Sequence, residues 1–180
     1  MTPTAMIKLL EGFAEIYEQA ATSSAMVGLA GSILRHGKRT IGYTPSECEP
    51  SLTEWVKWHK PKPKECYYNS QRIAMNVSGA VYYEGWFCIL PWPLPVLHAW
   101  VEIDGKLFDV TAEAYYSSLI EDGTIPASFI KQACYLGAAV PFEHVLLCQM
   151  ETEHYRDVLP FLWVNLGQRK EFLCNLEKSS

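Results

Sequence analysis

The sequence contains no pair of cysteines in the Cys-x-x-Cys spacing, although six cysteines occur among its 180 residues. Structural zinc sites and thioredoxin-like redox centres usually carry that spacing, so both have little support, and we expect neither a metal nor a cofactor. The cysteines are scattered, which is typical of reduced thiols: Cys48, Cys66, Cys88, Cys134, Cys148 and Cys174.

An excess of positive charge is also missing. Fifteen Lys and Arg residues stand against twenty Asp and Glu residues, and the formal net charge is -5. Phosphate-binding surfaces are usually basic, so nucleic acid is not an expected partner. Long uncharged apolar runs are missing at the start, because Lys8, Glu11, Glu15 and Glu18 interrupt the pattern of the first 21 residues. We therefore expect neither a signal peptide nor a membrane span, and a cytoplasmic location in the protein's own cell or in a host cell.

Internal repeats and low-complexity tracts are absent, which excludes a solenoid. With 49% hydrophobic and 19% charged residues, the composition is that of an ordinary globular protein, and the length suits one core. We expect a single α+β domain over residues 1–180. It would consist of N-terminal helices at 1–59, a core at 60–150 and a C-terminal helical segment at 151–180.

The most informative stretch is 96–111, in which two short runs of alternating residues flank Asp104-Gly105. Asp-Gly between such runs is the strongest short-range signal for a β-hairpin. A two-residue turn pairs Ile103 with Lys106. The pattern therefore predicts two antiparallel strands in a defined register.

In that register Trp100 lies opposite Asp109 and His98 opposite Thr111, so His98 and Asp109 are diagonal neighbours on one face. Diagonal residues lie roughly 7–8 Å apart at Cα, which an imidazole and a carboxylate can span with one hydrogen bond. The hairpin predicts a histidine that is oriented by an acid.

A nucleophile on the other side of that histidine would make the pair useful in catalysis. Cys66 follows the proline-containing segment 61–65 and precedes residues 67–75, which can form a helix. The positive end of a helix dipole and a nearby imidazolium both favour the thiolate. Cys66 is therefore the candidate nucleophile.

These stretches, which span about residues 60–112, resemble the transglutaminase-like group of papain-fold cysteine enzymes. The resemblance rests on Cys66 opening a helix, the strand 82–86, the sequence His98-Ala99-Trp100-Val101-Glu102 and the sequence Phe108-Asp109-Val110-Thr111. It implies a papain-like fold in which the nucleophile helix packs on an antiparallel sheet. It also implies that Cys66 accepts the acyl group, that His98 is its base and that Asp109 orients His98.

The expected activity is that of a cysteine hydrolase or acyltransferase that forms a thioester from an amide. The amide would be a peptide bond, an isopeptide bond or a glutamine side chain of a protein or peptide substrate. Transfer to water gives a protease or amidase and transfer to an amine gives a transglutaminase-like acyltransferase; the sequence leaves both open. The alternative is a non-catalytic protein-binding module that keeps the fold and uses an aromatic-rimmed cleft.

Aromatic residues near these motifs are candidates for the walls of a substrate cleft. Three tryptophans are expected to bind substrate: Trp58, Trp86 and Trp92. Apolar walls with few cations, here Lys62, Lys64 and Arg72, suit a polypeptide or an aromatic acyl group better than a phosphorylated metabolite. As plain structure, Trp58 would be a core aromatic and Trp92 part of a linker.

The rest of the chain supplies the framework. We expect helices at 4–21, 23–36 and 51–59, a strand at 80–90, a loop at 38–50, a loop at 135–142 and a strand at 144–149. Within the strand 80–90, Gly85 indicates a bulge or the close approach of another backbone.

Overall fold

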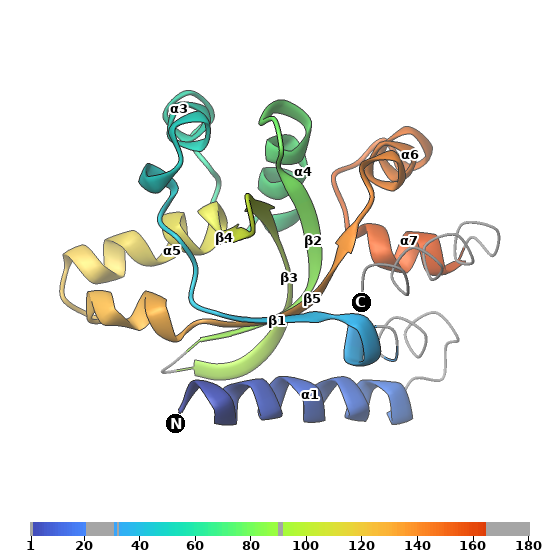
Figure 1. The fold of residues 1–180 in the computed structure, drawn as a ribbon, viewed down its shortest axis with the longest axis horizontal. Helices are drawn as coiled ribbons and strands as arrows, with labels where there is room; N and C mark the ends of the chain where they lie inside the picture. Colours follow the sequence, from blue (N-terminus) through green and yellow to red (C-terminus); the bar gives the residue numbers. More distant parts are fainter. Residues whose placement is uncertain (1, 21–30, 32, 90–91, 165–180) are drawn as a thin grey trace.

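The computed structural model describes residues 2–20, 31, 33–89 and 92–164, which form an antiparallel sheet with helices around it (Figure 1). The sheet has five strands in the order β1-β5-β2-β3-β4. The strands are β1 (Lys38–Ile41), β2 (Val81–Ile89), β3 (Trp92–Ile103), β4 (Lys106–Phe108) and β5 (Cys134–Val140). The expected α+β class is confirmed, with an antiparallel sheet.

The helices surround the sheet and form most of the remaining described chain (Figure 1). They are α1 (Pro3–Ala20), α3 (Pro50–His59), α4 (Cys66–Asn76), α5 (Val110–Glu121), α6 (Phe142–Thr152) and α7 (Val158–Val164), with 3-10 helices η1 (Ser46–Cys48) and η2 (Ala127–Gln132). Residues 33–36 are helical, and most of the helix expected at 23–36 lies outside the described residues. None of the described helices combines the length and hydropathy needed to cross a bilayer.

Both faces of the sheet are covered because alternate residues of β2 point to opposite sides. Tyr82 and Trp86 pack in one cluster with residues of α1, α4, α6 and α7. Phe87 and Ile89 pack in a second cluster, which contains Trp100 of β3 and residues of α5. Each face of the sheet therefore carries an apolar layer, and a third cluster joins Ile73 of α4, Val101 of β3 and Val110 of α5.

The segment 135–142, expected to be a loop, forms most of β5, which pairs with both β1 and β2. Glycine and alanine disfavour strands, which explains the wrong prediction. The small residues are required here because a Cβ on Gly137 would collide with the Trp100 ring and with the backbone carbonyl of Glu84. A Cβ on Gly85 would likewise collide with the backbone of β5, as the expected close approach requires.

Two further assignments are corrected. The expected loop 38–50 contains β1 and η1, so residues 1–59 are not purely helical. The expected strand 144–149 lies inside α6, where His144, Val145 and Cys148 are buried at helical spacing. A short apolar run does not by itself distinguish a strand from a helix, which is why the sequence misled.

The predicted hairpin is present, with Ile103 opposite Lys106. Asp104 and Gly105 both have positive φ, at 50° and 73°, as a type I′ turn requires. The strand pairing ends at Phe108, however, because Asp109 caps α5 by accepting a hydrogen bond from the Ala112 N–H. Thr111 is therefore helical and does not lie opposite His98 as predicted.

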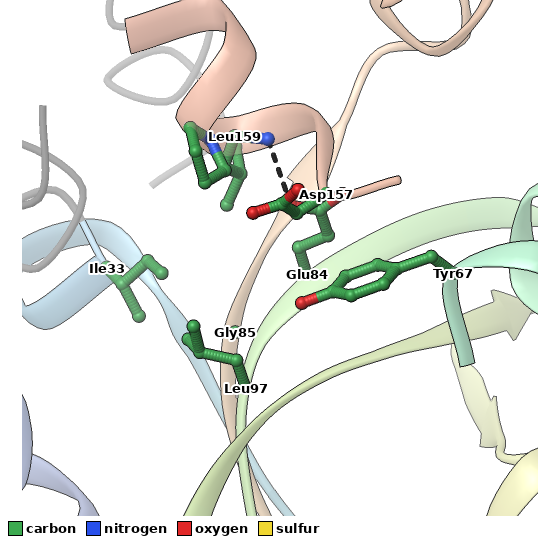
Figure 2. A pocket seen from close by; sticks show the side chains of 8 residues that line it. Ile33, Tyr67, Glu84, Gly85, Leu97, Asp157 and Leu159 are labelled. Atoms are coloured by element: carbon green, nitrogen blue, oxygen red, sulfur yellow. Dashed lines mark hydrogen bonds between the residues drawn. The ribbon is translucent and has the colours of Figure 1, made fainter. Parts of the chain in front are cut away.

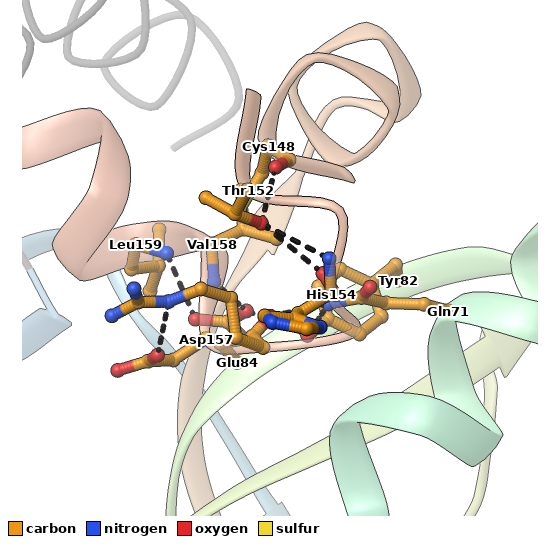
Figure 3. Close-up of polar contacts among 10 residues, drawn as sticks. Gln71, Tyr82, Glu84, Cys148, Thr152, His154, Asp157, Val158 and Leu159 are labelled. Carbon is orange, nitrogen blue, oxygen red and sulfur yellow. Dashed lines mark hydrogen bonds and ion pairs between the residues drawn. The ribbon is translucent and has the colours of Figure 1, made fainter. Parts of the chain in front are cut away.

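The buried carboxylate of Glu84 on β2 accepts hydrogen bonds from the start of α7 and so links this helix to the sheet (Figure 3). Glu84 Oε1 accepts hydrogen bonds from the Tyr82 hydroxyl (2.6 Å) and the Val158 N–H (2.5 Å), and Oε2 accepts one from the Leu159 N–H (2.9 Å). Helix starts leave such N–H groups without partners inside the helix. Burial raises the pKa of Glu84 to about 7, although these three hydrogen bonds act to lower it.

Replacing Gly137 by alanine tests the close approach of Trp100. We expect Gly137→Ala to lower the free energy of unfolding by about 1–3 kcal/mol, because the added methyl group overpacks the centre of the sheet. Gly12→Ala in α1 is the matched control, since no atom lies within 4 Å of its added Cβ. It should stabilise the protein by about 0.5–1 kcal/mol. Urea unfolding measures both, and equal stability of Gly137→Ala and wild type would contradict the packing.

The Glu84 carboxyl gives a second prediction, for the pH dependence of stability. The pKa of Glu84 is raised in the folded protein above its usual value of 4.5. The folded state thus binds this proton more tightly, and the resulting stability is complete below pH 4.5 and lost as pH rises through 7. Between pH 4.5 and 8, the unfolding free energy of wild type relative to Glu84→Gln should fall by about 3 kcal/mol. Urea unfolding measures both proteins. If the difference in unfolding free energy between wild type and Glu84→Gln stays constant from pH 4.5 to 8, the raised pKa of Glu84 is contradicted.

Candidate functional site

The structure brings Cys66, His98 and Asp109 together from three elements. Cys66 is the first residue of α4, His98 lies on β3, and Asp109 follows β4. His98 Nε2 lies 2.7 Å from Asp109 Oδ2, and the neighbouring Cys66 thiol helps to raise the pKa of the imidazole. Since Nε2 faces Asp109, Nδ1 is the ring nitrogen left for the thiol.

The Asp109 carboxylate is held by three donors. Oδ1 accepts a hydrogen bond from the Ala112 N–H (2.9 Å), and Oδ2 accepts one from the Tyr135 hydroxyl (2.9 Å) in addition to its contact with His98. Asp109 is 1% exposed, so water does not compete for these contacts. Tyr135 lies in the segment 135–142, for which the sequence predicts a loop, so its contact with Asp109 is not foreseen from the sequence. An aromatic residue next to Leu136 was the available signal for a strand.

His98 lies among aromatic rings. Its ring centroid is 4.9 Å from that of Phe87 and 6.5 Å from that of Trp100. Burial by itself lowers the pKa of His98, but the charge of Asp109 and the hydrogen bonds to Asp109 and Cys66 raise it to about 10. Asp109 therefore favours the protonated form of the imidazole, which lies beside the thiol.

The position of Cys66 follows from the way α4 is anchored. The Asn69 side chain is buried: its Oδ1 accepts from the Lys62 N–H (3.1 Å), and its Nδ2 donates to the Lys62 carbonyl (2.8 Å) and to Thr111 Oγ1 (2.9 Å). The Ser70 hydroxyl donates to the Ala99 carbonyl of β3 (3.1 Å). These contacts fix the first turn of α4 against α5 and against the strand that carries His98.

A pocket of about 280 Å³ opens beside His98. Its lining residues come from the loop before α4, from β2, from β3 and from α5: Lys64, Phe87, Val96, His98, Thr111, Ala112, Tyr115 and Tyr116. Most of its wall is apolar, as in binding sites for small organic groups.

Neither Trp58 nor Trp86 is found in the described wall of this pocket. Trp86 is 1% exposed and belongs to the core cluster with α1, so the expectation that it lines the cleft is wrong. The alternation of β2 explains this, because the neighbouring residue Phe87 faces His98 instead. Trp58 is 72% exposed on α3 and does not line the pocket. The side chain of Trp92 lies outside the described residues.

A second, smaller cavity lies between β2 and α7, and Tyr67, Glu84 and Asp157 are among the residues that line it (Figure 2). Its volume of about 10 Å³ matches a single water molecule, so it has no room for a substrate. Across residues 2–20, 31, 33–89 and 92–164, no group of three or more His, Cys, Asp or Glu side chains could hold a metal ion.

Comparisons of the chain with protein-family models, with curated proteins and with solved structures find no match.

Two substitutions at Asp109 separate its electrostatic role from its structural one. Asp109→Asn keeps the size and one side-chain oxygen but removes the charge, so it should lower the pKa of His98. Asp109→Ala also removes the cap of α5 and should cost about 1 kcal/mol or more in unfolding free energy. NMR titration of the imidazole and urea unfolding measure the two effects. An unchanged pKa of His98 in both variants would contradict the paired geometry.

Proposed function

We propose that this protein is a cysteine hydrolase or acyltransferase that acts on an amide through Cys66, His98 and Asp109. The observation that carries the proposal is the buried hydrogen bond of 2.7 Å between His98 and Asp109, on an imidazole that also contacts Cys66. The Cys, His, Asp order and the nucleophile helix support membership of the transglutaminase-like, papain-fold enzymes. The substrate we propose is a protein or peptide.

In the proposed reaction the proton of Cys66 resides on His98, and the Cys66 thiolate attacks the amide carbonyl carbon. The electron pair of the carbonyl moves to its oxygen. The Cys66 N–H stands at the start of α4, where helix geometry leaves it without an acceptor, and it can donate to that oxygen. His98 then gives its proton to the nitrogen of the leaving amine as the carbon–nitrogen bond breaks, and a thioester remains on Cys66.

In the second step water or an amine attacks the thioester. His98 accepts the proton of the attacking molecule and returns it to the sulfur of Cys66, which leaves as the carbon–sulfur bond breaks. Asp109 keeps the imidazole in one orientation and stabilises its cationic form. Because Tyr135 and the first turn of α5 hold Asp109, the imidazole has one fixed partner throughout the cycle.

The second candidate function is a protein-binding module without turnover. The low exposure of Cys66 and His98, 8% each, favours it, because an apposed thiol and imidazole that are nearly covered can serve packing alone. The pocket beside His98 would then hold a partner side chain.

A cytoplasmic location is proposed on the state of the cysteines. Cys48, Cys66, Cys88, Cys134 and Cys148 are free thiols, which is usual for proteins of reducing compartments.

Alkylation at pH 6 tests the activated thiol. A thiolate paired with imidazolium should make Cys66 react with iodoacetamide at least about tenfold faster than Cys48, which is exposed and serves as the internal control. Burial raises the pKa of the Cys88, Cys134 and Cys148 thiols, which should react slowest. Peptide mass mapping follows each site.

Turnover is tested by incubating wild type and Cys66→Ala with a peptide mixture. New peptide ends only with wild type indicate hydrolysis, and masses increased by an added amine indicate acyl transfer. Thermal unfolding controls for the fold of Cys66→Ala. Uniform slow alkylation together with unchanged peptides would favour the binding module instead.

A further inference from the structure

The pocket beside His98 lies on one side of the proposed catalytic pair. His98 lines it, whereas Cys66 is not among its lining residues. In an acyl transfer the thiol takes the acyl part of the substrate, and the imidazolium gives its proton to the amine that leaves. A substrate group that lies beside His98 and away from the sulfur therefore belongs to the amine component.

The walls of the pocket define the chemistry of that component. Phe87, Tyr115 and Tyr116 present rings, and Val96 and Ala112 add aliphatic surface. The volume of about 280 Å³ lies just below the range of roughly 300–1,000 Å³ that ligand pockets span. It suits a single aromatic or branched aliphatic side chain.

One wall residue is a lysine, Lys64, which is exposed to solvent. Lys64 lies two residues before Cys66 with a φ of 67°, a left-handed conformation that residues other than glycine rarely adopt. The two hydrogen bonds between Asn69 and the backbone of Lys62 hold this loop. Lys64 Nζ lies 5.8 Å from the centroid of the Tyr115 ring, which is part of the pocket wall.

The Lys64 ammonium has no carboxylate partner among the described residues. Its neighbour Lys62 does, with Glu65 Oε2 at 3.5 Å from its Nζ. Apart from His98, Lys64 is also the one ionisable cation in the described wall of the pocket. An apolar recess with a single ammonium at its wall is complementary to an apolar group that carries one negative charge.

We infer that this pocket binds the amine component of the substrate and that this component is an apolar amino acid with a free carboxylate. Lys64 is the residue that determines this specificity by binding the carboxylate. The substrate class is therefore an N-acyl apolar amino acid, either as a small molecule or at the C-terminus of a peptide. The inference rests on the proposed function, which assigns the leaving-group side to His98.

Binding to Cys66→Ala protein, in which no turnover occurs, tests the inference. The probes are N-acetyl-phenylalanine, its carboxamide, N-acetylglycine and a tetrapeptide that ends in phenylalanine, titrated by calorimetry. N-acetyl-phenylalanine should bind about tenfold more tightly than its carboxamide, because only the acid can form a charged hydrogen bond with Lys64. N-acetylglycine should bind more weakly because it leaves the apolar recess empty. If the tetrapeptide binds more tightly than N-acetyl-phenylalanine, the substrate is the C-terminus of a peptide. If N-acetyl-phenylalanine binds more tightly, the substrate is a small N-acyl amino acid.

Lys64→Asn in the same protein should abolish the preference for the acid, since asparagine tolerates the left-handed backbone but carries no charge. Lys60→Asn is the matched control. Lys60 also has a positive φ, 47°, and lies in the same loop, but it does not line the pocket. The preference should survive in that variant.

Equal affinity for the acid and its carboxamide, absence of binding by all four probes, or loss of the preference in Lys60→Asn would overturn the inference. Fast alkylation of Cys66 together with any of these results would leave the proposed catalytic function standing. A clear preference for the acid together with slow alkylation of Cys66 would instead leave a carboxylate-binding pocket and remove the catalytic proposal.

Discussion

The hydrogen bond between His98 Nε2 and Asp109 Oδ2 is the contact on which the geometry of the candidate site depends. It crosses from β3 to the first residue after β4, and it is buried. A buried carboxylate is costly unless its oxygens are satisfied. The surrounding elements supply the donors: the first turn of α5 and Tyr135 of β5 complete the set. β3, α5 and β5 therefore all contact the Asp109 side chain. Because Asp109 is held in place, it fixes the orientation of the His98 imidazole toward Cys66.

The features that could be predicted from the sequence are those that local chemistry dictates. Asp104-Gly105 specifies the hairpin, since both residues adopt positive φ at little cost, and the register follows from the turn. The proline-containing segment before Cys66 likewise specifies where α4 begins. The proximity of His98 and Asp109 could be anticipated because the hairpin joins β3, which carries His98, to β4, which Asp109 follows. The roles given to them remain proposals.

The features that could not be predicted from the sequence depend on contacts between distant segments. Gly137 and its alanine neighbours oppose strand formation locally, yet β5 is an inner strand of the sheet, and a Cβ at position 137 would collide with the Trp100 ring. Trp86 resembles a surface aromatic in sequence, but the pleat of β2 turns it into the core. The cap of α5 ended the strand at Phe108, one residue before the predicted pairing of Asp109. Tyr135 could not be linked to Asp109 until β5 was placed.

The position of β5 between β1 and β2 also sets an order on the assembly of the fold. β2, β3 and β4 are consecutive in the chain and pair as a local meander, whereas β1 joins the sheet only through β5, about a hundred residues later. Non-local pairing of this kind is slow because a long loop must close first. Until β5 inserts, β2 presents an unpaired edge, a surface prone to association with other chains. A ribosome that has synthesised only the first 110 residues has made Cys66, His98 and Asp109, but not Tyr135, whose hydroxyl donates a hydrogen bond to Asp109.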